Sequence, residues 1–355
     1  MLAQQSAFVS DISYGVTVRA AREADRASWN VFVGARPEGT FFHRFEWSDV
    51  LAKALNHRTH YLLAERQGTL AGVLPLAEVR SALFGHALIS TPFCVYGGAL
   101  AVDDAARNAL EQHATALAQS LGVAYLEMRN RSPVNADWPD KKLYVTFRKP
   151  ISPDHDENLK AIPRKQRAEV RKGIKAGLAS RIDADSATLY DLYSTSLHNL
   201  GTPVFGARYL RALKSAFGAD CEIVTVLNGS VPVSSVMSFY FRDEVLPYYG
   251  GGGADARKVS ANDFMYWEVM RRAADRGCRL FDFGRSKRDS GSYAFKKHWG
   301  FEESGLSYEY ALVTAAQVPN LSPTNSKYAL MVGAWRRMPL WLTRILGPPI
   351  ARNLG

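Results

Sequence analysis

The sequence has few cysteines and no long apolar stretch, and both shortages exclude classes of protein. Its 355 residues include three cysteines, Cys94, Cys221 and Cys278, which are far apart and lie in apolar surroundings. Such spacing predicts buried thiols in a reducing compartment, not a disulfide framework or a zinc knuckle. The first residues lack a basic segment followed by an apolar core, and no run of about 18 apolar residues occurs. We therefore expect a cytoplasmic protein without a membrane-spanning segment.

The motifs of several common enzyme classes are missing as well. The sequence contains no G-x-x-x-x-G-K-[ST] loop, no G-x-S-x-G elbow and no H-E-x-x-H helix. His43, His57 and His60 lie close together, but no acidic or cysteine partner stands at metal-ligand spacing from them. The sequence thus gives no support for a P-loop enzyme, an elbow hydrolase or a zinc protease, and we predict no metal.

What the sequence does have is an excess of positive charge. It has 44 Lys and Arg residues against 34 Asp and Glu residues, which gives a formal net charge of +10 and a pI of about 9.5. This excess favours an anionic partner such as nucleic acid, a nucleotide-linked sugar or an acidic membrane surface. Hydrophobic residues make up 47% of the sequence, so the chain is globular and long enough for two domains.

The segment between residues 160 and 181 is strongly basic, since it contains eight Lys or Arg residues and a single acid, Glu169. Arg164, Arg167 and Arg171 fall on one face of a predicted helix. Like charges at this spacing destabilise a helix by roughly a few tenths of a kcal/mol per pair. A solvated surface helix is one interpretation, but the strong excess of positive over negative charge favours a face that binds an anionic partner.

The order of predicted elements repeats along the chain. Each half is predicted to contain helices, a strand meander, a strand that ends in glycines, a helix and a further strand, which is typical of the mixed α/β class. In the first half we expect helices at 22–34 and 45–55, a hairpin from 60 to 79, a strand that runs into Gly97, a helix at 105–121 and a strand at 124–128. In the second half we expect helices at 188–200 and 207–217, strands at 222–227, 231–241 and 245–249, a helix at 264–276 with a capping box from Ser260, and a strand at 279–283. A strand at 307–313 follows, and then an amphipathic helix at 328–346 that would dock on the core and could also touch a membrane surface.

The segment from Phe281 to Phe301 combines aromatic, basic and glycine residues. It predicts a strand that ends at Gly284 with Asp282 at the lip of a sheet, a basic loop that holds Arg285, and a helix that begins at Ser292. The residues alone are compatible both with a charged turn beside a core strand and with a functional site.

Two strands are predicted to end in glycines, one at Tyr96-Gly97-Gly98 and the other from Tyr248 to Gly251. Glycine lets a ligand approach the backbone closely, so both ends are candidate binding positions.

Several segments resemble the FemAB-like group of Fem-type aminoacyltransferases. They are FFHRFEWSDV, ALISTPFCVYGG, AIPRKQRAEVRKGIKAGL, LGTPVF, SFYFRDEVLPYYGGG, NDFMYWEVMRRA and FDFGRSK through FKKHWGF, and together they cover nearly the whole chain. The resemblance extends to the bacterial branch associated with exosortase and PEP-CTERM systems. One departure is the pair Asp289-Ser290, where that branch would have Gly-Thr.

The resemblance implies two tandem GNAT-like (acyl-CoA N-acyltransferase-like) domains, with mixed sheets flanked by helices. We expect an N-terminal domain at 1–150, a C-terminal domain at 151–320 and a helical tail at 321–355. The implied activity is transfer of an acyl or aminoacyl group to an amine of a cell-envelope precursor, either peptidoglycan or exopolysaccharide. The donor would be aminoacyl-tRNA or acyl-CoA, and the absence of the Q/R-x-x-G-x-G/A pyrophosphate loop argues against CoA. The acceptor would be an anionic small molecule or a lipid-linked glycan precursor.

The resemblance also implies which residues form the site. A lysine of the FKK segment, Lys296 or Lys297, would stabilise charge on the attacked ester or bind acceptor phosphates, and Asp282 is assigned to the same cleft. General chemistry agrees, because an activated ester needs little beyond proximity and an oxyanion stabiliser. The expected substrate-binding residues are Arg164, Arg167, Arg171, Tyr96, Gly97, Tyr248, Tyr249, Gly250, Gly251, Arg285, Ser286, Tyr293 and Trp299.

Two other functions stay open. One is acyl-CoA-dependent N-acetylation of an amino sugar. The other is non-enzymatic binding of RNA or an anionic polysaccharide by the basic helix, which would depend steeply on salt.

Overall fold

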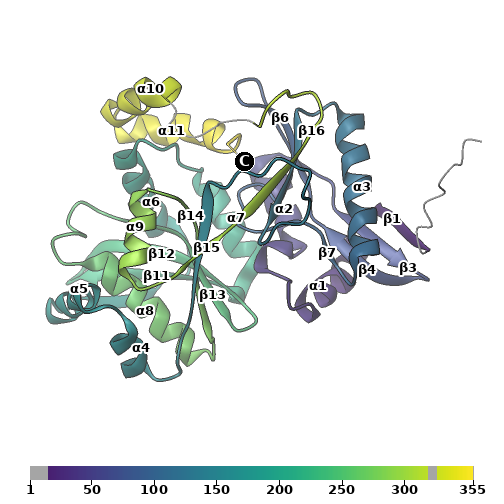
Figure 1. Cartoon of the computed structure of the whole chain (residues 1–355). Coiled ribbons are helices and arrows are strands. Elements are labelled where there is room, and N and C mark those ends of the chain that lie inside the picture. Colours follow the sequence, from purple (N-terminus) through teal and green to yellow (C-terminus); the bar gives the residue numbers. More distant parts are fainter. Residues whose placement is uncertain (1–14, 319–325, 355) are drawn as a thin grey trace, which may run out of the picture.

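The computed structural model describes residues 15–318 and 326–354, and it shows two halves that lie side by side (Figure 1). The N-terminal half consists of helices α1 to α3 and strands β1 to β8. Its helices are α1 (Arg26–Ala35), α2 (Glu46–Leu55) and α3 (Asp104–Leu121), and its strands are β1 (Val16–Ala20), β2 (Arg58–Thr59), β3 (Leu62–Arg66), β4 (Thr69–Leu74), β5 (Ala77–Ser81), β6 (Gly85–Ser90), β7 (Leu100–Ala101) and β8 (Tyr125–Asn130).

Two sheets form the N-terminal half. One has the strand order β1-β3-β4-β7, and the other has the order β16-β8-β6-β5-β2, where β16 (Ser307–Leu312) comes from late in the chain. Helix α3 packs on both sheets and buries Leu110, Ala114 and Ala118. The hairpin expected from 60 to 79 is correct only as far as β4, because the chain leaves the first sheet at Pro75 and β5 joins the second.

The C-terminal half has one seven-stranded sheet with helices on both faces. Its strand order is β10-β11-β12-β13-β14-β9-β15. Neighbouring residues of a strand face different cores, since Ile223 and Met237 pack with α6 and α7, whereas Val224 and Val236 pack with α8. The elements are α4 (His155–Ala161), α5 (Arg164–Lys175), α6 (Ala187–Leu200), α7 (Ala207–Phe217), α8 (Ala261–Asp275), α9 (Gly291–His298), β9 (Tyr144–Pro150), β10 (Ala179–Ile182), β11 (Cys221–Asn228), β12 (Val231–Phe241), β13 (Glu244–Gly252), β14 (Leu280–Lys287) and β15 (Glu303–Gly305).

The two halves exchange strands. Strand β9, which the sequence analysis did not predict, ends the first half of the sequence but pairs with β14 and β15 in the C-terminal sheet. Strand β16 follows the C-terminal sheet along the chain but pairs with β8 in the N-terminal half. The domain limits expected at residues 150 and 320 stay a prediction, and they would assign β9 and β16 to the halves whose sheets they do not join.

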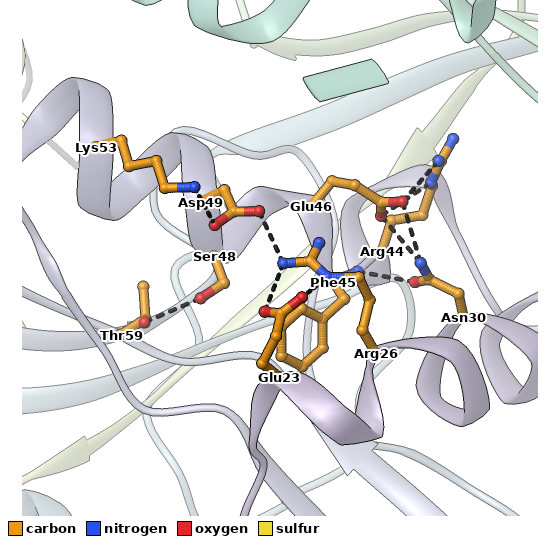
Figure 2. A network of polar contacts seen from close by, with 10 residues as sticks. All are labelled: Glu23, Arg26, Asn30, Arg44, Phe45, Glu46, Ser48, Asp49, Lys53 and Thr59. Atoms are coloured by element: carbon orange, nitrogen blue, oxygen red, sulfur yellow. Dashed lines mark hydrogen bonds and ion pairs between the residues drawn. The ribbon is translucent and has the colours of Figure 1, made fainter. Parts of the chain in front are cut away.

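Aromatic and polar contacts join the halves. The ring of Phe41, just before α2, lies 4.5 Å from the rings of Phe217 and Phe239 in the C-terminal half. Arg44 forms an ion pair with Asp220 at 2.7 Å. Figure 2 shows the polar network around Arg44 that also ties α1 to α2. These contacts fix the relative position of the halves, so walls of one cavity can come from both.

Two helices of the C-terminal half compare differently with the predictions. The basic helix predicted within 160–181 is present as α5, which starts directly after Pro163 and ends at Lys175, whereas the short helix α4 before it was not predicted. The capping box at Ser260 does not form, since the side chain of Asp263 accepts hydrogen bonds from Gln166 and Trp299 instead.

The strand and helix near residue 285 also differ from the predictions. Strand β14 does not end at Gly284 but continues to Lys287, so Arg285 lies in a strand and not in a loop. Gly284 has a φ of 65°, which bends the strand without ending it. Helix α9 is capped by Ser290, whose hydroxyl accepts a hydrogen bond from the backbone of Tyr293.

The C-terminal tail forms two helices, α10 (Ser326–Arg337) and α11 (Leu340–Ala351), instead of the single helix expected at 328–346. Pro339 separates them, since proline cannot donate the hydrogen bond that would continue the first helix. Both lie against α6 (Figure 1). Within residues 15–318 and 326–354, no helix has the length and apolar character needed to cross a bilayer. The three cysteines are free and buried, as predicted.

Candidate active site

Strands β13 and β14 start side by side and then separate. Their parallel pairing joins residues 244–245 to residues 280–281, and in the described chain it goes no further. An extra residue in β13, Tyr248, then forms a bulge against β12, and β14 bends at Gly284. A cavity of about 440 Å³ lies between the separated strands.

This cavity is aromatic and positively charged. Much of its wall consists of seven aromatic side chains, and its two cations are Arg285 and Lys296. No Asp or Glu side chain of the described residues lines it. A pocket of this size, with apolar walls and a few polar groups, is typical of a small-molecule site. The seven aromatic residues are Phe93, Tyr193, Phe205, Tyr248, Tyr249, Tyr266 and Phe283.

Lys296 reaches the cavity from α9. Its Nζ donates hydrogen bonds to the backbone carbonyls of Gly284 and Arg285, both at 3.0 Å. Burial lowers the pKa of Lys296 to about 7, although the charge of Asp282 opposes this shift. An ammonium group has three N–H donors, so one remains for a ligand once the carbonyls are bound.

The neighbouring Lys297 has a different environment. It is exposed, and its Nζ donates to the hydroxyl of Tyr293 at 3.3 Å. The sequence left the choice between the two lysines open, and the geometry places Lys296 on the cavity and Lys297 in solvent.

Arg285 is fixed by aromatic residues. Its guanidinium donates to the hydroxyl of Tyr308 at 3.2 Å and lies 4.5 Å from the ring centroid of Tyr144. No carboxylate of the described residues lies within ion-pair distance of Arg285 or Lys296. Both cations can therefore interact with a negative charge brought by a ligand.

Asp282 lies behind the cavity and does not line it. Its side chain has no exposed surface, and it accepts hydrogen bonds from the hydroxyl of Tyr96 at 2.8 Å and the backbone of Gly284 at 2.6 Å. The Nε of Arg148 lies 3.2 Å from the same carboxylate. The expected position at an open sheet lip is therefore incorrect, because β14 continues past Asp282 and the N-terminal half covers it. Asp282 and Tyr96 link the two halves.

The other expected site residues divide into two groups. Tyr248, Tyr249 and Gly250 line the cavity together with Arg285 and Lys296. The remainder lie elsewhere in the described chain: Gly251 packs against α6, Ser286 is buried in β14, Tyr293 donates to Glu303, Trp299 is buried and donates to Asp263, and Gly97 lines a separate hollow.

The basic helix α5 also lies away from the cavity. Arg164 and Arg171 are exposed, and Arg167 is partly buried and donates to the carbonyl of Lys160 at 3.1 Å. Helix α5 packs on α8, and none of these three described side chains lines the cavity. The predicted anion-binding face of α5 is thus a surface distinct from the cavity.

Several lining residues were missed by sequence reasoning. Phe93 and Val95 come from the N-terminal half, Thr202, Pro203 and Phe205 from the loop between α6 and α7, and Ala351 and Leu354 from the tail. The segments ALISTPFCVYGG and LGTPVF contain the first two groups and were noted only as family motifs. Their proximity to β13 depends on the packing of the two halves, which no local pattern reports.

A larger hollow of about 820 Å³ lies on the N-terminal half, beside Gly97 and the start of α3. Its polar groups have mixed charge, since Arg107 and Arg131 line it together with Glu38 and Asp104. The described residues contain no group of three or more His, Cys, Asp or Glu side chains arranged to hold a metal. We consider the cavity between β13 and β14 the better candidate, because its cations have no acidic partners.

Known proteins resemble the chain in this region and over its whole fold. Residues 164–297 match the family described as an acetyltransferase (GNAT) domain. This range contains the residues that the C-terminal half contributes to the cavity, apart from those of the tail. No curated protein matches the chain.

The fold is similar to several solved structures. FemX is 15% identical with a TM-score of 0.65, and the match covers 84% of this chain and 98% of FemX. The C-terminal domain (DUF2156) of a putative lysylphosphatidylglycerol synthetase from Agrobacterium fabrum is 13% identical with a TM-score of 0.56, over 88% of this chain and 96% of that one. A tandem GNAT protein from the clavulanic acid biosynthesis pathway is 12% identical with a TM-score of 0.53, over 85% and 99%.

These similarities agree with the architecture. The two halves have the tandem GNAT fold that was expected, with mixed sheets flanked by helices. The acetyltransferase domain contains the separated strands β13 and β14 and the lysine that lies between them. The expected enzyme class is thereby confirmed, and the chain is an acyltransferase with a GNAT domain at residues 164–297.

Proposed function

We propose that this protein transfers an acyl or aminoacyl group to an amine of a cell-envelope precursor, either peptidoglycan or exopolysaccharide. The observation that carries the proposal is the position of Lys296, whose amino group lies in an acid-free cavity between the separated strands of a GNAT domain. Similarity to FemX and to a lysylphosphatidylglycerol synthetase supports a role in the cell envelope. The motifs shared with the exosortase and PEP-CTERM-associated branch support placing the chain there.

Lys296 would act on the carbonyl that is attacked. The acceptor amine forms a bond to the carbonyl carbon of an activated ester, the bond to the leaving oxygen breaks, and the proton of the amine leaves with that oxygen. Negative charge develops on the carbonyl oxygen between these steps, and an ammonium group at hydrogen-bond distance stabilises it. The carbonyls of Gly284 and Arg285 hold Lys296 in place, so little rearrangement is needed.

The donor that we favour is aminoacyl-tRNA, because the start of α8 is poorly suited to the pyrophosphate of CoA. Helix N-termini attract phosphates in many proteins. Here α5 covers that end, where Ser260 donates to Glu169 at 2.6 Å and Asp263 accepts from Gln166. Two carboxylates at this position would repel a phosphate. The exposed cations Arg164 and Arg171 of α5 would then contact the tRNA backbone.

The acceptor that we favour is anionic, either a small molecule or a lipid-linked glycan precursor. Arg285 and Lys296 give the cavity two cations with no lining acid in the described chain, so a phosphate or carboxylate of the acceptor would be attracted. A lipid-linked acceptor requires access from a bilayer. We therefore place the reaction in the cytoplasm at the periphery of the inner membrane, with the contact made by the tail.

The experiment is a transfer assay on purified full-length protein and two lysine variants. Labelled amino acids on bulk charged tRNA are offered as donor, together with an extract of lipid-linked envelope precursors. Lys296→Met should lower the rate about 100-fold or more, the usual loss when an oxyanion donor is removed. The matched control is Lys297→Met, which should retain the rate of the parent. Equal rates for the parent and Lys296→Met would refute the role of Lys296.

A second function, acyl-CoA-dependent acetylation of an amino sugar, is favoured by the match to the GNAT domain family. It predicts that CoA or acetyl-CoA raises the melting temperature, because a ligand that binds the folded state stabilises it. Under our proposal neither compound changes the melting temperature.

A further inference from the structure

The tail helix α11 has one face buried and the opposite face exposed and apolar. Thr343, Gly347 and Ala351 recur at a spacing of four residues and face the protein. Gly347 is needed for this close contact, because a Cβ there would lie 2.9 Å from the carbonyl oxygen of Val204. Small residues thus let the helix lie flat on the C-terminal half.

The outer face carries large apolar side chains in contact with solvent. Trp341 is 63% exposed, Ile345 is 62% exposed and Leu346 is 39% exposed. Pro349 and Arg352 continue the same face towards the C-terminus. Tryptophan beside aliphatic and basic residues on one helical face is typical of helices that lie in the surface of a bilayer.

The charge of the tail has a single sign. Between residues 326 and 354 the sequence contains no Asp or Glu, and its cations are Lys327, Arg336, Arg337, Arg344 and Arg352. Arg344 is used internally, since it pairs with Asp191 at 3.0 Å, whereas Arg336, Arg337 and Arg352 are exposed. The exposed tryptophan and isoleucine complement the apolar acyl chains of a bilayer, and the cations beside them complement its anionic headgroups.

The same helix forms a wall of the candidate active site. Ala351 and Leu354 line the cavity, and His57 of the N-terminal half donates from Nε2 to the carbonyl of Arg352 at 2.6 Å. Figure 1 shows α11 along the outside of α6, with its end at the junction of the two halves. A surface that covers the outer face of α11 would therefore lie next to the cavity.

We propose that the outer face of α11 binds an anionic lipid bilayer and holds the cavity beside it. The biological purpose of this binding, which is to bring the cavity to a lipid-linked acceptor, rests on the proposed function. The binding itself follows from the exposed face of α11 and does not depend on any transfer reaction.

The test is co-sedimentation of the full-length protein with phosphatidylcholine vesicles, prepared with and without phosphatidylglycerol. We expect binding to the vesicles that contain phosphatidylglycerol, and weaker binding at high salt, because lipid charge is screened. The double variant Trp341→Ser, Ile345→Ser should bind about tenfold more weakly or worse, since two large apolar side chains no longer enter the bilayer.

A matched control changes two equally exposed apolar residues elsewhere. Leu83 is 77% exposed and Val231 is 61% exposed, and neither belongs to the tail. The variant Leu83→Ser, Val231→Ser should bind vesicles like the parent. Both double variants should melt like the parent, because all four side chains face solvent.

Three results would overturn the inference: no binding of the parent to anionic vesicles, equal binding by the tail variant, or equal loss in the control variant. A parent dimer that the tail variant abolishes, without vesicle binding, would also overturn it and would show that a second copy covers the face. If vesicles are bound but no acyl transfer is found, the proposed function fails and this inference stands.

Discussion

The strand pairs β6/β8 and β13/β14 occupy matching places in the two halves, but one is closed and the other is open. Strands β6 and β8 pair in parallel over residues 87–90 and 125–128, twice the length found for β13 and β14. Beyond β6 the chain itself fills the gap, because the backbone of Gly97 donates to the carbonyl of Arg129 at 2.8 Å. A repeated fold therefore provides two gaps between strands, and the segment that follows each strand decides which gap becomes a cavity.

An arginine on each second strand shows the same difference. Arg129 on β8 and Arg285 on β14 lie over the ring of Tyr308, with distances of 5.4 Å and 5.6 Å to its centroid. Arg129 is buried, pairs with Glu127 at 2.7 Å and donates to two backbone carbonyls. Arg285 faces the cavity and donates its hydrogen bond to the hydroxyl of Tyr308. Within the described residues, its guanidinium has no acidic partner at ion-pair distance and no carbonyl acceptor. One arginine serves the fold, and the other is available to a ligand.

The largest expected effect comes from substituting these two arginines. Arg129→Met leaves the buried Glu127 without its partner, which should lower the free energy of unfolding by about 3–5 kcal/mol. Arg285→Met removes one hydrogen bond to Tyr308 and should cost about 1 kcal/mol. Urea unfolding of both variants measures the difference. If the two substitutions lower the free energy of unfolding equally, the proposed difference between the closed pair β6/β8 and the open pair β13/β14 is wrong.

A smaller effect is expected when the pH is changed, and it concerns only the site between β13 and β14. Lys296 has a pKa of about 7, and the ammonium form is the one that stabilises an oxyanion. The kcat/KM for transfer should therefore fall above about pH 7, by up to about tenfold per pH unit. A rate that rises with pH would show that the neutral amine is the active form.

The same pKa can be tested without activity. Burial holds the pKa of folded Lys296 below its value of 10.5 in the unfolded chain, so the unfolded state binds more protons between about pH 7 and 10.5. The stability of the parent relative to Lys296→Met should therefore rise with pH across this window. Unfolding measured at several pH values gives this difference directly.

The smallest effect is expected at the bulge of β13. The hydroxyl of Tyr248 donates to the carbonyl of Phe93 at 2.7 Å, which ties the open strand pair to the N-terminal half. Tyr248→Phe should lower the free energy of unfolding by about 1 kcal/mol. Tyr209→Phe is a useful control, because its hydroxyl bonds to Tyr249 within the C-terminal half and Tyr209 is not among the residues that line the cavity. Only the first variant should change the affinity for a cavity ligand.

Much of the fold could be predicted from the sequence, because local patterns specify most elements. The helices α3, α6 and α7 and the strands β11 to β13 lie within a few residues of their predicted limits. Strand β9 was missed, because the polar and basic residues of TFRKP hide the buried Val145 and Phe147. Its place between β14 and β15 depends on pairing far along the sequence, which a local pattern does not contain.

The candidate site was predictable only in part. Lys296, Arg285 and the residues 248–250 lie on or near glycine-rich strand ends, which is a local signal. Asp282 was placed wrongly, since its carboxylate is covered by Tyr96 from the N-terminal half and by Arg148 on the neighbouring strand β9. The opposite wall at Phe93 and the tail wall at Leu354 exist only because distant segments meet there.

The exchange of β9 and β16 has a consequence for how the protein is made. The five-stranded N-terminal sheet has β16 at its edge, next to β8, and residues 307–312 are synthesised after almost the whole chain. Domains usually fold in order as they leave the ribosome. Here the edge of β8 stays unpaired until the C-terminal sheet has been translated, so the first half to be synthesised is the last to be completed.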